Sequence, residues 1–160
     1  GLILGQYSIT YERVLSEETS VKMDLQYYFP SETDIGYSAL SIVPEFRFFF
    51  SPDFDADGWF VGGYLKYRYA VQENGYYVYD PSSPIANEYR DITLSGLAVG
   101  FSTGRKWVTR SGFVYEIHAG LGRFLFQNET VEGVLNPEDT GFDILPNVDA
   151  RLGVVFGYRF

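Results

Sequence analysis

Hydrophobic and polar residues alternate at a period of two along almost the whole chain, and the last segment shows this most clearly. Every second residue there is apolar: Val148, Ala150, Leu152, Val154, Phe156, Tyr158 and Phe160. The positions between them include Asp149, Arg151 and Arg159. Such alternation predicts a β-strand with one apolar and one polar face. The apolar face is longer than strands of soluble sandwiches usually provide, because these average about five or six residues in total.

The same alternation predicts six earlier strands, at about 2–13, 20–30, 38–51, 58–71, 91–103 and 112–127. It is blurred only in 91–103, where we place Leu97, Val99 and Phe101 outward and Gly96, Ala98 and Gly100 inward. A strand that crosses the bacterial outer membrane needs about 9–11 residues, apolar toward lipid and polar toward the lumen. The pattern therefore predicts an all-β, antiparallel, up-and-down transmembrane β-barrel, formed by a single domain over residues 1–160.

The connections between the predicted strands alternate between short and long. The short ones are 14–19, 51–58 and 103–111, and the long ones are 30–38, 72–91 and 127–145. Short turns face the periplasm in outer-membrane barrels, and the strand number is normally even. Seven visible strands therefore lead us to expect eight, with the first upstream of Gly1. The alternative is additional structure within 72–91.

Composition narrows the chemistry. The 14 tyrosines, 14 phenylalanines and 17 glycines suit strands, and the absence of cysteine argues against thiolate metal sites and a cysteine nucleophile. The net charge of −9 argues against a nucleic-acid partner. The excess of acidic residues falls in the long connections. We expect no cofactor and no metal.

Charges on the predicted inward faces are balanced between acidic and basic residues. Buried charges are tolerated when they are paired, and an eight-stranded barrel is just wide enough for its side chains to fill. We therefore predict a packed salt-bridge network in the lumen, and not a pore. Its members are Glu12, Lys22, Asp24, Glu45, Arg47, Lys66, Arg68, Glu116, His118, Asp149 and Arg151. Arg105 and Lys106 are assigned to a periplasmic turn.

His118 is the only histidine, and Glu116 precedes it on the same predicted face. A catalytic base in a membrane-embedded hydrolase is one interpretation. His118 is predicted to point inward, however, and no Ser–His pairing is visible in the sequence. We therefore favour a hydrogen-bonding role in the lumen, and we expect no enzymatic activity.

The segment Asp53–Gly58 reads DFDADG, which is similar to the opening of a calcium-binding EF-hand loop. The EF-hand requires a bidentate glutamate at its twelfth position, where this chain has Tyr64, and it requires flanking helices. The sequence instead predicts a hairpin turn.

Two features of the outer side are candidates for recognition. Tyr76, Tyr77, Tyr79 and Tyr89 form either a partner-binding loop or an extension of the aromatic girdle. Arg123, predicted to face outward, either contacts a lipopolysaccharide phosphate or extends its head group to the membrane interface.

Two parts of the chain, 7–15 with 20–29 and 42–50, resemble an uncharacterised family of small outer-membrane barrels of Bacteroidota. The matching motifs are YSITYERVL and IVPEFRFFF. The resemblance implies the outer membrane, an architecture similar to OmpX- and OmpA-type eight-stranded barrels, and a further strand before the first segment. It implies no catalytic residues. The terminal Phe156, Tyr158 and Phe160 also resemble the carboxy-terminal signal that the barrel-insertion machinery reads.

The function expected from the sequence is a non-enzymatic outer-membrane barrel with a filled lumen, acting as a structural or accessory subunit of a larger outer-membrane complex. Its expected partners are membrane lipid, lipopolysaccharide and the insertion machinery. The alternatives are a soluble lipocalin-like periplasmic barrel that binds a ligand and a lipid-modifying outer-membrane enzyme.

Overall fold

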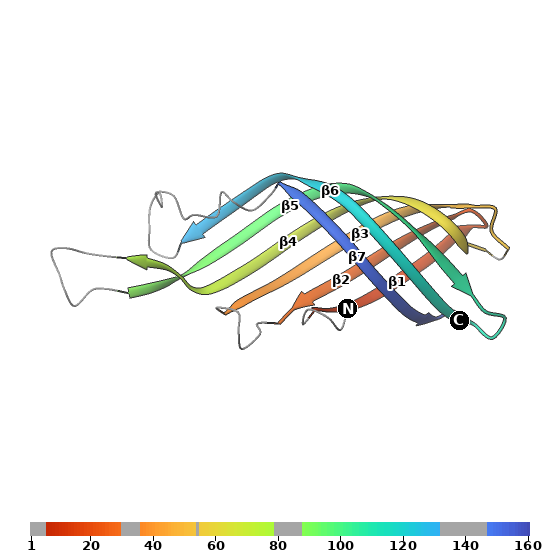
Figure 1. Ribbon diagram of the computed structural model, residues 1–160, viewed down its shortest axis with the longest axis horizontal. Coiled ribbons are helices and arrows are strands. Elements are labelled where there is room, and N and C mark those ends of the chain that lie inside the picture. Colours follow the sequence, from red (N-terminus) through yellow and green to blue (C-terminus); the bar gives the residue numbers. More distant parts are fainter. Residues whose placement is uncertain (1–5, 30–35, 54, 79–87, 132–146) are drawn as a thin grey trace.

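The protein forms a single antiparallel sheet whose seven strands follow one another in chain order. The computed structural model describes residues 6–29, 36–53, 55–78, 88–131 and 147–160. The strands are β1 (Gln6–Ser16), β2 (Thr19–Tyr28), β3 (Tyr37–Phe50), β4 (Gly58–Val78), β5 (Glu88–Val108), β6 (Phe113–Val131) and β7 (Val148–Tyr158). The sheet curls strongly into a half-barrel, with its short turns at one end (Figure 1). None of the described segments forms a helix long and apolar enough to cross a membrane.

The predicted inward and outward faces are confirmed, including those of the blurred segment. In β5, Ala98 and Ser102 are buried, whereas Val99 and Phe101 are exposed. Gly100, one of the inward residues of β5, lies against the ring of Tyr64 of β4. A Cβ atom added at Gly100 would lie only 2.5 Å from the ring of Tyr64. The alternation of apolar and polar residues is therefore unclear in the sequence at a position where a small residue leaves space for the Tyr64 ring.

Three strands, β4, β5 and β6, are longer than the sequence predicts, and the extension of β5 corrects the assignment of one turn. β5 continues to Val108, so Lys106 lies on its buried inward face and not in a periplasmic turn. Arg105 belongs to the same strand and is exposed on the outward face. The prediction was wrong because the outward positions 103 and 105 are polar, which ends the apparent apolar face before the strand itself ends.

The β4–β5 hairpin also extends further at the opposite end. The backbone of Tyr76 pairs with Arg90, and that of Tyr77 pairs with Tyr89. The backbones of these three tyrosines therefore belong to strands, while Tyr79 lies outside the described residues. A register shift between Gln72 and Tyr76 separates this extension from the rest of the hairpin.

Apolar side chains gather at both ends of the concave interior. At the turn end, Phe49, Ala56 and Phe60 form one cluster, and at the other end Ala70, Ile92 and Leu94 form a second. The β3–β4 connection folds over the turn end, where the amide of Ala56 donates to the carbonyl of Glu17 at 2.7 Å. Charged side chains occupy the space between the two clusters.

Candidate functional site

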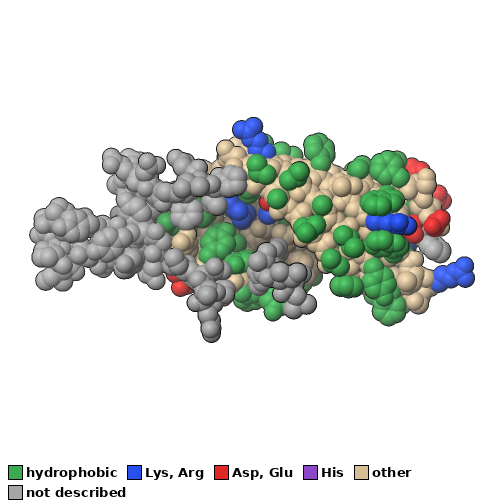
Figure 2. Space-filling view, viewed as in Figure 1, with side chains coloured by type: hydrophobic (Ala, Val, Ile, Leu, Met, Phe, Trp, Pro, Cys, Tyr) green, Lys and Arg blue, Asp and Glu red, His purple; other side chains and the backbone are tan. Residues whose placement is uncertain are grey.

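The convex wall of the sheet is apolar over most of its area. Leu152 is 86% exposed and Phe101 is 80% exposed, and many other large hydrophobic side chains share this face. Figure 2 shows hydrophobic side chains spread over the described wall. Near the turns the exposed residues form an aromatic band, which comprises Phe48, Phe50, Trp59, Trp107, Phe113, Tyr115, Phe156 and Tyr158.

On the concave side, Glu116 is the acceptor at the centre of the charged interior. Its carboxylate binds the Arg47 guanidinium at 2.7 and 2.9 Å and lies 3.3 Å from the Lys22 ammonium. His118 Nδ1 lies 2.9 Å from Glu116 Oε1. All four side chains are buried. One buried carboxylate thus pairs with two basic side chains and contacts a histidine.

The ion pairs continue from Glu116 across the whole sheet. Arg47 also binds Glu45 at 2.7 Å, and Arg151 joins Glu45 at 3.3 Å to Asp24 at 2.9 Å. Lys106, which the sequence did not assign to the interior, binds Glu12 at 2.6 Å. We call these residues and their ion-paired neighbours the interior charge cluster: Glu12, Lys22, Asp24, Glu45, Arg47, Lys66, Lys106, Glu116, Asp149 and Arg151. Every strand of the sheet contributes at least one member.

The remaining predicted interior residues make other contacts. The His118 ring lies against β7 at Gly153, where an added Cβ atom would be 2.6 Å from His118 Cε1. Arg68 lies over the ring of Phe124, with its guanidinium carbon 4.5 Å from the ring centroid. Among the described residues, Arg68 pairs with no carboxylate, and its Nη2 lies 3.5 Å from the Gln127 side-chain oxygen.

Lys66 and Tyr64 both bind Asp149 of β7. Lys66 Nζ lies 2.6 Å from one carboxylate oxygen, and the Tyr64 hydroxyl donates to the other at 2.9 Å. A single carboxylate thereby joins β4 to the last strand.

The charged groups of this interior are paired with one another. Within the described segments, no group of side chains could hold a metal ion. The carboxylates of the interior charge cluster are all engaged by basic side chains. In the turn that resembles an EF-hand, Asp55 accepts a hydrogen bond from Arg159 at 3.1 Å.

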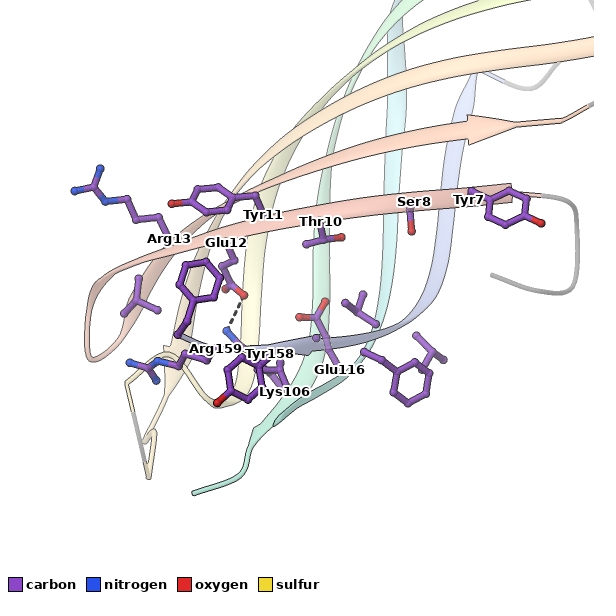
Figure 3. Close-up of a pocket in the computed structure, with 17 residues that line it drawn as sticks. Tyr7, Ser8, Thr10, Tyr11, Glu12, Arg13, Lys106, Glu116, Tyr158 and Arg159 are labelled. Atoms are coloured by element: carbon purple, nitrogen blue, oxygen red, sulfur yellow. Dashed lines mark hydrogen bonds and ion pairs between the residues drawn. The ribbon is translucent and has the colours of Figure 1, made fainter. Parts of the chain in front are cut away.

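A groove of about 800 Å³ separates β1 from β7. Figure 3 shows Ser8, Thr10 and Glu12 on one side of β1 and Tyr11 and Arg13 on the other. Since each strand is antiparallel to the next and there are seven, β1 and β7 run in the same direction. The two edges therefore cannot complete the antiparallel pattern by pairing with each other.

The other predicted site residues lie on the outer face. Arg123 is exposed, between Val99 and Val148 on the neighbouring strands. Phe156, Tyr158 and Phe160 are also exposed, and two of them stack edge-on, Phe156 with Tyr115 and Tyr158 with Phe113. The sequence missed Lys106, although the inward alternation of positions 102, 104 and 106 continues the strand to that point.

Fold and interior together define an all-β half-barrel with an apolar convex wall and a concave face of paired charges. The chain belongs to DUF3575, a family described as a protein of unknown function, whose pattern matches residues 2–135. No curated protein and no solved structure match the chain.

We predict that Glu116→Gln lowers the free energy of unfolding by about 3–5 kcal/mol, because it leaves buried basic side chains without their partner. The measurement is urea unfolding of the folded protein in micelles. Asp55→Asn is the matched control, since it breaks an exposed pair and is expected to cost less than about 1 kcal/mol. Equal losses in the two variants would contradict a central role of Glu116.

Proposed function

We propose that this protein is an eight-stranded outer-membrane barrel without enzymatic activity, which acts as a structural or accessory subunit of a larger outer-membrane complex. The observation that carries the proposal is the inverted distribution of side chains. Apolar residues face outward along every strand, and ionised residues are buried inside and paired with one another.

The outer wall favours lipid as its surroundings. Soluble monomers rarely expose contiguous apolar patches of more than a few hundred Å². Here every one of the seven strands carries exposed large hydrophobic side chains on its outward face, as transmembrane barrels require, although positions 103 and 105 of β5 are polar. A lipocalin-like ligand-binding barrel would need the opposite arrangement, with its apolar face lining a cavity.

The groove between β1 and β7 supports closure by one further strand. A strand antiparallel to both edges would restore the up-and-down pattern and raise the strand number to eight, which is even. We assign this strand to a segment that precedes β1, because the resemblance to small outer-membrane barrels implies a further strand before the first segment. Closure would also provide hydrogen-bond partners for the unpaired backbone N–H and C=O groups of both edges. Lipid hydrocarbon offers no such partners.

The paired interior supports a scaffold in preference to a channel or an enzyme. The interior charge cluster and the two apolar clusters occupy the described lumen. Among the described side chains, no serine hydroxyl contacts His118, whose ring lies between Glu116 and Gly153. We therefore place the contacts with a larger complex on the outer wall and on the long connections, which are strongly acidic in sequence.

For a wall embedded in a membrane, we expect a charged substitution to lower the free energy of unfolding by an amount that depends on its depth in the bilayer. Leu152→Arg, in the middle of β7, should lower the free energy of unfolding in vesicles by about 2–4 kcal/mol. Phe113→Arg, at the turn end, should cost about 1 kcal/mol or less. The measurement is urea unfolding in phosphatidylcholine vesicles. If both variants were as stable as the parent protein, the wall would face water and the proposal would fail.

Closure by an eighth strand predicts the distance between the edge strands β1 and β7. The measurement uses protein purified from its host membrane. The chain contains no cysteine, so Tyr11→Cys and Phe156→Cys provide the only labelling positions in this sequence. One intervening strand would hold the two edge backbones about 10 Å apart, twice the usual strand spacing. Spin-label broadening measures this separation. A spacing of about 5 Å would show direct contact and contradict an eighth strand.

The accessory role predicts a stable companion. Gentle extraction of the host membrane in detergent, followed by affinity isolation and mass spectrometry, should recover a second outer-membrane protein in fixed stoichiometry. A complex that persists in Glu116→Gln but is lost on mutation of the outer wall would place the contact outside the barrel. Recovery of this chain alone would contradict the accessory role and leave a free-standing barrel.

A further inference from the structure

The outward face of the turn end holds an arginine between two tryptophans. Arg105 lies directly opposite Trp59 in the β4–β5 register, and Trp107 follows it on the same face of β5. The guanidinium carbon is 5.6 Å from the ring centroid of Trp59 and 5.2 Å from that of Trp107. Both distances lie within the range of a cation–π interaction, so the two indoles fix the position of the charge.

These three residues sit where the wall ends. Trp59 is the second residue of β4, and β5 ends at Val108, directly after Trp107. They belong to the aromatic band near the short turns. Tryptophan concentrates at the boundary between hydrocarbon and water, where the indole has an apolar body and a polar N–H. On the proposed function, on which this inference rests, the site lies at the level of the lipid head groups.

Arg105 differs from Arg47 and Arg151 of the interior in having no acidic partner among the described residues. Arg47 and Arg151 each bind two or more carboxylates, and Arg159 binds Asp55. Within the described part of the chain, no carboxylate lies at ion-pair distance from Arg105. A cation–π interaction with an indole does not use the guanidinium N–H groups as hydrogen-bond donors to an acid, so they can donate to an added ligand. The guanidinium presents several N–H donors in one plane, and this arrangement matches the oxygens of a phosphate.

We propose that Trp59, Arg105 and Trp107 form a binding site for the phosphate of a glycerophospholipid in the leaflet at the turn end. Arg105 donates to the phosphate oxygens, and the exposed indoles pack against the glycerol and upper acyl chains. A lipid fits better than free phosphate because both flanking residues offer apolar surface. Arg123 is the contrasting case, because among the described residues it has no aromatic ring stacked on it.

The test uses the intrinsic fluorescence of the protein. The chain contains two tryptophans, and both belong to this site, so their emission reports on it alone. The folded protein in maltoside micelles, which carry no phosphate, is titrated separately with dioleoylphosphatidylglycerol, with dioleoylglycerol and with inorganic phosphate. The variants are Arg105→Gln, Arg105→Lys and, as the matched outward control, Arg123→Gln. Circular dichroism checks that each variant is folded.

We expect a saturable change in emission with dioleoylphosphatidylglycerol and none with dioleoylglycerol or millimolar phosphate. Arg105→Gln should weaken the apparent affinity about tenfold, Arg105→Lys by less, and Arg123→Gln not at all. An equal response to dioleoylglycerol, or an unchanged affinity in Arg105→Gln, would overturn the proposal. An equal response to inorganic phosphate would make this a general anion site and overturn the assignment to lipid.

Failure of this site is distinguishable from failure of the proposed function. A protein that shows the depth-dependent cost of arginine on its wall but no response to phosphatidylglycerol is a membrane barrel without this lipid site. A protein that tolerates arginine at Leu152 in vesicles lacks the membrane setting on which the site depends.

Discussion

The pairing of buried charge is the constraint on which this structure depends. The carboxylate of Glu116 and the guanidinium of Arg47 are both buried, and each would be costly to leave alone in a low-dielectric interior. Their partners come from strands that only a curled sheet brings together. Since a slip of one residue would turn a whole strand inside out, the same pairs also hold the register.

The sequence predicted the faces of the strands far better than their ends or partners. A period of two assigns each residue to a face without reference to any other strand, which is why even Ala98 and Gly100 were placed correctly. Strand ends depend on whether a neighbour continues beside them, and β5 extends to Val108 because β4 and β6 accompany it. For this reason the sequence did not predict that Lys106 lies on the inward face of β5.

The partners in the interior charge cluster lie beyond the reach of sequence reasoning for a different reason. Arg151 and Asp24 are 127 positions apart, and nothing local to either residue indicates the other. Balanced charge on the inward faces predicted that pairs would exist, and the curvature of the sheet decides which pairs form. Tyr64 shows how curvature and composition work together, since glycines at 100, 120 and 122 leave space for its ring beside β5 and β6.

The participation of β7 in the interior bears on the order of assembly. Asp149 is the ion-pair partner of Lys66, and Arg151 adds a second basic partner to Asp24 and to Glu45, so the charges of the interior are fully paired only when the last strand has been placed. Contacts this distant in sequence form slowly, because a long loop must close first. Placement of β7 therefore acts as a checkpoint in folding, because the charges of the described interior are fully paired only after this strand has docked.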